Sequence, residues 1–179
     1  MQIHLVLTVI GRDRPGLVSR LAETVAAGGG NWLDTRMARL SGQFAGMLLV
    51  SIAPEKADAL VESLRKLDAQ GLRFIIEKCD APAQIGGRTL RLDLVGLDRP
   101  GIIRDISQVL AAHNVSIAEL ESECVSGSFS GEAMFKANAR LTLPDDLPVE
   151  LLRQHLEELA DELMVDLSLD ANSALVHSG

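Results

Sequence analysis

Gly11–Val18 reads Gly-Arg-Asp-Arg-Pro-Gly-Leu-Val, and Gly96–Ile103 reads Gly-Leu-Asp-Arg-Pro-Gly-Ile-Ile. The second stretch lies 85 residues after the first and repeats its Gly, Asp, Arg, Pro and Gly in order. Each stretch follows apolar residues at strand spacing and precedes apolar residues at helical spacing. This repeat predicts that the 179-residue chain contains one small domain twice.

The residues around the first turn predict the order strand, helix, strand, strand, helix, strand. Apolar residues alternate across Ile3–Ile10, and they recur at helical spacing across Leu17–Val25 until three glycines end the run. A hairpin follows, and Pro54 and Gly71 mark the start and end of a second helix. The expected strands are 3–10, 32–40, 44–52 and 72–78, and the expected helices are 17–27 and 54–70.

The second half repeats this order. Its expected strands are 90–95, 116–125, 132–143 and 165–169, and its expected helices are 102–110 and 148–163. Such a unit folds as a four-stranded antiparallel sheet with both helices on one face. We therefore expect an α+β protein of two tandem βαββαβ ferredoxin-like domains, at 1–80 and 88–170, with a linker at 81–87 and a C-terminal tail at 171–179. Because small domains are marginally stable alone, we expect the copies to pack on each other or on a second chain, so a homodimer is possible.

Composition places the chain among globular proteins, since 47% of its residues are hydrophobic. No apolar run approaches the roughly 18 residues of a membrane span, and the first residues lack the pattern of a signal peptide. Two cysteines predict no disulfide framework, so we expect a cytoplasmic protein. Residues 88–179 carry a net charge of −9, which opposes direct contact with nucleic acid. This acidity suits a solvated surface or a docking face for a basic partner.

Catalytic and metal chemistry find little support in the sequence. The two glycine turns lack the Lys-Ser/Thr pair of a phosphate-binding loop. The four histidines are dispersed, which argues against a zinc site, and neither cysteine has a histidine nearby. We expect no catalytic residue, no metal and no cofactor.

The repeated turn is itself a candidate binding site. Backbone amides at Gly16, Leu17 and Val18 open a helix, where they lack intrahelical partners and the helix dipole favours a carboxylate. Pro15 stiffens the approach, Gly16 lets a ligand come close, and Asp13 suits an ammonium group. A carboxylate and an ammonium group this close describe an α-amino acid. The same logic applies to Asp98, Pro100, Gly101, Ile102 and Ile103.

A purely structural interpretation of the same turn stands beside this one. Asp-x-Pro-Gly is favourable turn chemistry by itself, and Asp13 is well placed to cap the helix. A duplicated domain also repeats its structural turns, so the repetition does not decide between the two.

The arrangement resembles the ACT domain, a regulatory module that most often senses amino acids. The resemblance rests on Asp13-Arg14-Pro15-Gly16 and Asp98-Arg99-Pro100-Gly101, supported by Gly30-Asn31-Trp32 and Val115-Ser116-Ile117, and it covers nearly the whole chain in two copies. The pair without a catalytic domain is most similar to the glycine cleavage system transcriptional repressor family. The stretch 30–38 is the most specific part of that match.

The resemblance implies where a ligand would bind. In ACT domains the ligand lies where the first loop and helix of one copy meet the second strand of its partner copy. This implies Asp13, Arg14, Gly16 and Asn31 in the first copy. In the second copy it implies Asp98, Gly101, Asn114 and Ser116. The first copy is the better expected site, because Ser116 replaces Asn31 and Ile117 replaces Trp32.

The resemblance also implies a function. It suggests a cytoplasmic regulator that binds a small amino acid, with glycine expected first, and that contacts a DNA-binding activator without binding DNA or membrane itself. One alternative is a regulatory subunit of an amino-acid biosynthetic enzyme, which shares the ligand chemistry. A small hydrolase or transferase on a ferredoxin-like fold is a third, and no catalytic constellation supports it.

Overall fold

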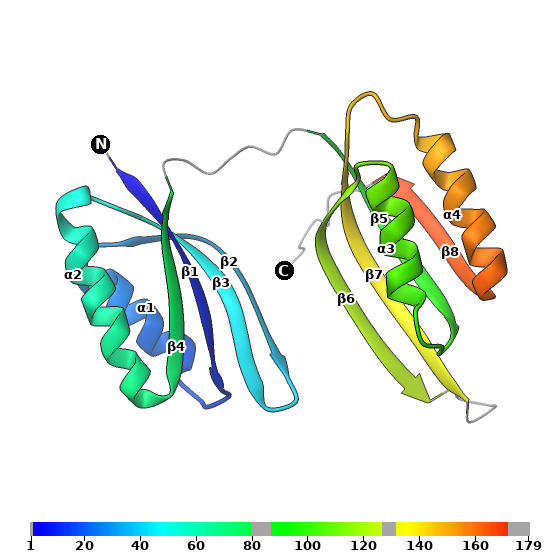
Figure 1. The fold of residues 1–179 in the computed structure, drawn as a ribbon. Coiled ribbons are helices and arrows are strands. Elements are labelled where there is room, and N and C mark those ends of the chain that lie inside the picture. The colour runs from blue at the N-terminus through cyan, green and yellow to red at the C-terminus, as the bar shows by residue number, and fades with distance from the viewer. Residues whose placement is uncertain (1, 80–86, 127–131, 172–179) are drawn as a thin grey trace, which may run out of the picture. The chain divides into compact units, whose positions relative to one another are not determined.

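A computed structural model describes residues 2–79, 87–126 and 132–171 of the chain (Figure 1). The chain forms two compact units, which we call unit 1 (residues 1–84) and unit 2 (residues 85–179). The described part of unit 1 consists of β1 (Ile3–Arg12), α1 (Leu17–Ala27), β2 (Asn31–Leu40), β3 (Gln43–Ile52), α2 (Pro54–Arg65), the 3₁₀ helix η1 (Lys66–Gln70) and β4 (Leu72–Cys79). That of unit 2 consists of β5 (Arg88–Leu97), α3 (Ile102–Ala112), β6 (Ser116–Ser126), β7 (Ala133–Leu143), α4 (Val149–Leu163) and β8 (Val165–Ala171).

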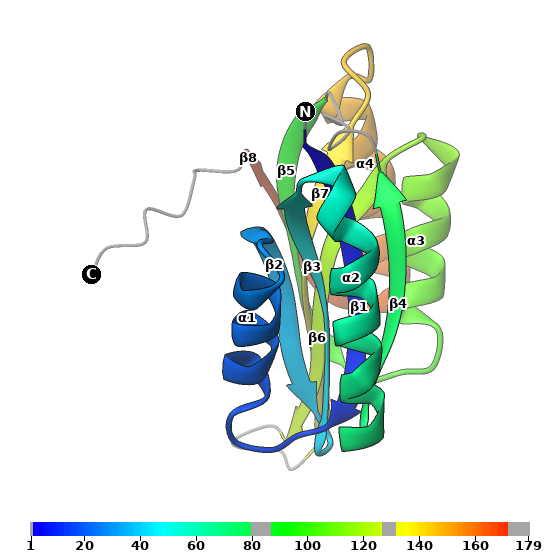
Figure 2. The ribbon, with the colours of Figure 1, turned by 90° about the vertical axis from the view of Figure 1, so that its left-hand side faces the viewer.

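Each unit is one antiparallel sheet with two helices on one face (Figures 1 and 2). The strand order is β2-β3-β1-β4 in unit 1 and β6-β7-β5-β8 in unit 2, so the first strand of each unit lies in the centre. The expected α+β fold of two βαββαβ ferredoxin-like units is confirmed. We call the sheet face away from the helices the open face of each unit.

The core of each unit lies between the sheet and its helices. In unit 1, Leu5 and Leu7 of β1 pack with Leu21 of α1 and Leu60 of α2, and all four are at most 1% exposed. Full burial of one such side chain contributes about 1.5–3 kcal/mol. Unit 2 has a separate core with the same layout, built around Leu92, Leu110, Leu141, Leu152 and Leu156. Each unit therefore has its own source of stability.

Several boundaries differ from expectation. β1 and β5 are longer than predicted, because Gly11 and Gly96 still pair within their sheets, with Phe44 and Phe135. A Cβ on Gly11 would lie 2.5 Å from the carbonyl oxygen of Gly71, so close backbone approach explains that glycine. The turn of unit 1 is thus shortened to residues 13–16.

Other differences are smaller. α2 ends at Arg65 and continues as η1 rather than as α-helix, and Pro148 precedes α4 as its N-cap. Asp170 and Ala171 pair with β5, although Ala171 was expected in the tail. The predicted linker through 86, the loop at 127–130 and the tail from 172 lie outside the described residues. No helix among the described ranges has the length and apolarity needed to cross a membrane.

Candidate functional site

The turn between β1 and α1 depends on a glycine in the left-handed conformation. Gly16 has φ 85° and ψ 4° and is the N-cap of α1. A Cβ at this position would meet no described atom within 4 Å. Glycine is therefore favoured here by the backbone conformation and not by crowding, and the turn is open on that side.

The N-terminus of α1 is open to an anion. Among the described side chains none caps α1, and its first turn holds no acidic residue. Gly16, Leu17 and Val18 were expected to have free amides. The amide of Leu17 instead donates to the carbonyl oxygen of Arg14 at 3.4 Å, which is a long and weak hydrogen bond. The helix dipole then leaves partial positive charge at the turn that no first-turn side chain neutralises.

Asp13 belongs to a small polar cluster with the β2–β3 hairpin. Its amide donates to the carbonyl oxygen of Gly42 at 3.0 Å, and its Oδ2 accepts from Nη1 of Arg39 at 3.1 Å. The structure shows no side-chain cap on α1, so the expectation that Asp13 caps this helix is wrong. Asp13 and Arg39 instead present a carboxylate and a guanidinium side by side at the turn.

The turn between β5 and α3 has the same backbone but different surroundings. Gly101 has φ 103°, and the amide of Asp98 donates to Ala133 as Asp13 does to Gly42. A Cβ on Gly101 would lie 2.9 Å from Nη2 of Arg104, whose Nε donates to Oδ1 of Asp105 at 2.7 Å. That hydrogen bond lowers the pKa of Asp105, which stays ionised in the first turn of α3. The chain itself thus supplies the negative charge that α3 favours.

Asp98 lies beside Cys124 instead of an arginine. Partial desolvation, followed by the neighbouring Asp98 carboxylate, raises the pKa of the Cys124 thiol, so this thiol is a poor nucleophile. Cys124 occupies the position in unit 2 that Arg39 occupies in unit 1, because it follows Arg39 by 85 residues, the offset of the repeat. Arg99 keeps a buried Nη2 with no hydrogen-bond partner among the described atoms, so unit 2 also has one donor to spare.

The strand residues of the expected site lie far from the turns. Asn31 starts β2 opposite Ser51, beyond the C-terminal end of α1, and α1 has 11 residues. That helix is about 16 Å long, so Asn31 does not join Asp13 within unit 1. Ser116 occupies the same place in unit 2, opposite Thr142. Within each unit the structure therefore separates the strand residue of the expected site from the turn residues.

Asn114 has a backbone role that its sequence position did not reveal. It follows the C-cap of α3 with φ 55°, and its amide donates to the carbonyl oxygen of Ala111 at 3.0 Å. Gly29, its counterpart in unit 1, has φ 77°. Asparagine tolerates this left-handed conformation better than most residues, and ligand contact by Asn114 stays a prediction.

Comparison with known families decides the relationship. Residues 3–77 match one ACT domain model and residues 90–161 match another. The chain belongs to the ACT domain family. Its two ACT domains coincide with the two units of the structure, and the recognised pair of Asp-Arg-Pro-Gly turns stands at the same place in each.

Several proteins match this tandem ACT protein over nearly its whole length. The glycine cleavage system transcriptional repressor of Escherichia coli is 27% identical over 174 residues, covering 94% of this chain and 90% of that protein. A crystal structure of a protein of unknown function from Galdieria sulphuraria superposes with a TM-score of 0.81, at 27% identity, covering 96% of this chain and 99% of that one. The crystal structure of a candidate glycine cleavage system transcriptional repressor superposes with a TM-score of 0.70 at 22% identity, covering 95% of this chain and 97% of that one. This likeness shows the shared fold.

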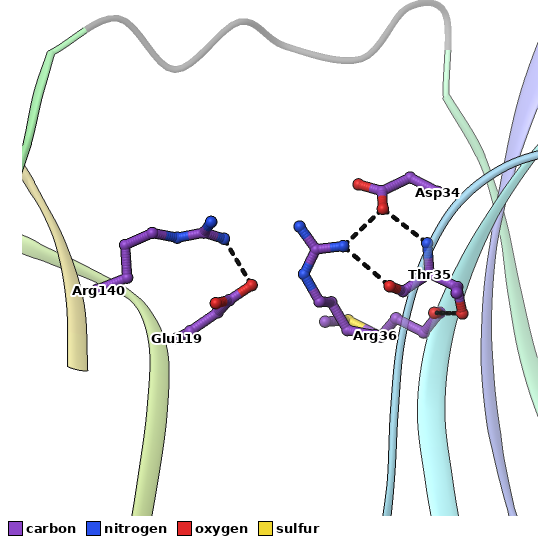
Figure 3. A network of polar contacts seen from close by, with 6 residues as sticks. Asp34, Thr35, Arg36, Glu119 and Arg140 are labelled. Carbon is purple, nitrogen blue, oxygen red and sulfur yellow. Dashed lines mark hydrogen bonds and ion pairs between the residues drawn. The ribbon is translucent and has the colours of Figure 1, made fainter. Parts of the chain in front are cut away.

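Side chains typical of metal sites do not gather in the described parts of the ACT units. No group of three or more potential metal ligands occurs among those residues. Two of the four histidines contact each other, because Nδ1 of His155 lies 2.7 Å from Nε2 of His113, and the pair is partly buried. Glu119 lies against Arg140 within unit 2 (Figure 3).

Arg39 and Arg104 are the site residues that sequence reasoning missed. Each decides the electrostatics of one turn, yet neither belongs to the repeated motif. Arg104 follows Gly101 by three residues and therefore returns over the turn by helical periodicity, a signal that was available. Arg39 reaches Asp13 only through the register of the hairpin, which the sequence alone did not fix.

Proposed function

We propose that this tandem ACT protein is a cytoplasmic regulator that binds a small α-amino acid, glycine in the first instance, at the β1–α1 turn of unit 1. Ligand binding changes its contact with a DNA-binding regulatory protein, and the chain does not itself bind DNA or catalyse a reaction. The open, uncapped N-terminus of α1 at Gly16 is the observation that carries this proposal.

The polar groups at the turn complement both ends of an amino acid. A ligand carboxylate accepts from the N-terminal amides of α1 and from the Arg39 guanidinium, which favours carboxylates. A ligand ammonium group pairs with the Asp13 carboxylate, which is one-third exposed at its side chain. The ligand dipole then lies antiparallel to the Asp13–Arg39 pair. Asn31 and Ser116 remain predicted contacts that a partner copy would supply.

A small ligand fits this turn better than a large one. Gly16 leaves its outer side open, but the polar groups that would hold the ligand are backbone amides and short-range charges. The turn offers no apolar pocket for a large side chain, because Asp13, Arg14 and Pro15 are all exposed. The name of the E. coli relative supports glycine as the first ligand to test.

The proposed output is a change in a protein–protein contact. A ligand shifts a conformational equilibrium by its difference in affinity between two states. The net charge of −8 makes DNA a poor direct partner, whereas a basic regulatory protein is electrostatically suited. In this proposal the amino acid is the signal, and a changed contact with a protein partner is the output.

Calorimetric titration of the full chain tests the ligand. We expect saturable binding of glycine, with weaker binding of alanine and serine and none of a branched-chain amino acid. Preference for a larger amino acid would favour the regulatory subunit of a biosynthetic enzyme instead. Absence of binding by every one of them would overturn the proposal and leave the turns as structural features.

Two matched substitutions locate the binding site. Asp13→Asn removes the charge that pairs with the ligand ammonium group, and we expect glycine affinity to fall about tenfold or more, since a charged hydrogen bond contributes about 1.5–3 kcal/mol. Asp98→Asn makes the same change at the turn of unit 2, and we expect it to leave the affinity unchanged. The reverse pattern would move the site to unit 2.

A further inference from the structure

The open face of unit 1 is apolar at its centre. Directly paired residues of neighbouring strands point to the same face of a sheet. Val6 pairs with Leu49 of β3, and Thr8 pairs with Met47 of β3 and Ile75 of β4. Met47 and Ile75 are 53% and 65% exposed, and Ile10 of β1 is 40% exposed. These apolar side chains surround Thr8 on one sheet face, and exposed apolar side chains gathered in this way mark an interaction site.

The fold does not require most of this face to be apolar, because unit 2 has polar residues at most of the equivalent positions. Val95, the equivalent of Ile10, is apolar and 37% exposed. The equivalents of Val6 and Leu49 are Arg91 and Arg140, and those of Thr8, Met47 and Ile75 are Asp93, Asn138 and Ser168. Arg91 is bonded to Asp93 through two hydrogen bonds. The open face of unit 2 therefore suits water, and the open face of unit 1 suits another apolar surface.

Charges on β4 show which apolar surface would fit. Arg73 pairs with Ile10 at one end of the patch, and Glu77 pairs with Val6 at the other end. The two lie four residues apart on the open face, about 13 Å along the strand, with Ile75 midway between them. A two-fold axis that runs across the strands at Ile75 exchanges these ends. This axis places Arg73 of each copy opposite Glu77 of the other copy, which makes two ion pairs. It also places Val6 of each copy opposite Ile10 of the other.

We propose that the open face of unit 1 is the surface on which a second copy of this chain docks, sheet against sheet. In such an isologous contact the same patch serves both copies, and aligned sheets pack about 10 Å apart with interdigitated side chains. Met47 and Ile75 of each copy fill the centre, and the Arg73–Glu77 pairs fix the direction.

The β2 side of the face is compatible with this contact. Arg36 lies at the level of the axis, opposite Met47 on β3. Its Nη1 donates to Oδ1 of Asp34 and to the carbonyl oxygen of Thr35 (Figure 3). Compensation within its own strand limits the repulsion between the two copies of Arg36.

The molar mass of the full chain in solution, followed by sedimentation equilibrium over a range of concentrations, tests the contact. We expect a dimer that Ile75→Glu weakens about tenfold or more, because the axis brings the two new charges together. The matched control is Ser168→Glu at the equivalent position of unit 2, which should leave the dimer intact. Circular dichroism checks that each variant is folded, and Ile75 is exposed enough to tolerate the change.

A charge exchange makes the test specific to the proposed geometry. Arg73→Glu alone sets two carboxylates against each other and weakens the dimer, and Arg73→Glu combined with Glu77→Arg restores it. A wild-type chain that stays monomeric would overturn the proposal. A dimer that survives both Ile75→Glu and Arg73→Glu would also overturn it, because it would use another surface.

Discussion

At the scale of single residues, Gly16 and Gly101 have the same backbone conformation but different charged neighbours. Gly16 and Gly101 both take left-handed conformations that a side chain strains, so the motif is structural in both units. What differs is the neighbour: Asp13 meets Arg39, whereas Arg104 lies over Gly101. The structural and ligand-binding interpretations are therefore compatible, because the backbone explains the glycine, and the neighbouring side chains are the reason that we propose the ligand site at the turn of unit 1.

The left-handed conformation gives a stability prediction. Gly16→Ala should lower the free energy of unfolding by about 1–2 kcal/mol through backbone strain alone, since a Cβ meets no described atom there. Gly16→Asn should cost less, because asparagine tolerates this region. Urea denaturation of the three proteins measures the difference. An alanine variant as stable as the wild type would show that the turn is not held in this conformation.

At the scale of elements, the spacing of apolar residues and the positions of Gly and Pro predicted the type and order of every described strand and α-helix. Boundaries moved by a few residues, as at Gly11, because strand pairing extends until its partner ends. The site was predictable only where it is local. The cluster of Asp13 with Arg39 needs the hairpin register, which places residues 26 positions apart in contact. No short-range rule provides that.

Packing between elements gives a second stability prediction. Leu60 of α2 is fully buried and lies against Gly28, where a Cβ would come 2.8 Å from its Cδ1. Leu60→Ala should lower the free energy of unfolding by about 2–5 kcal/mol. Leu40→Ala is the control, because Leu40 is 79% exposed and should change stability by less than about 0.5 kcal/mol. Equal effects of the two changes would contradict the assigned core.

At the scale of the whole molecule, duplication has been followed by divergence. Both units keep the same sheet order, yet they differ in charge and polarity. The first turn of α1 holds no acidic residue and the open face of unit 1 is apolar, whereas α3 has Asp105 in its first turn and unit 2 has most of the negative charge. The chain as a whole carries −8. The proposed ligand site and the proposed self-association surface both lie in unit 1, on different surfaces.

The charge of the whole molecule gives a prediction about nucleic acid. Fluorescence anisotropy of a labelled DNA duplex should not change when the full chain is added at physiological salt, with or without glycine. An acidic protein gains little from counterion release, which drives most non-specific DNA binding. Binding that weakens steeply as salt rises would contradict this and would point to direct contact with phosphates.

The most direct test of the central claim is a glycine titration of the full chain followed by the backbone amide resonances in NMR. The ligand carboxylate is proposed to accept from the amides at the start of α1. We predict saturable shifts at Gly16, Leu17 and Val18, with Gly101, Ile102 and Ile103 nearly unchanged. Shifts confined to the turn of unit 2, or glycine binding that leaves both turns unmoved, would contradict the assignment of the ligand to unit 1.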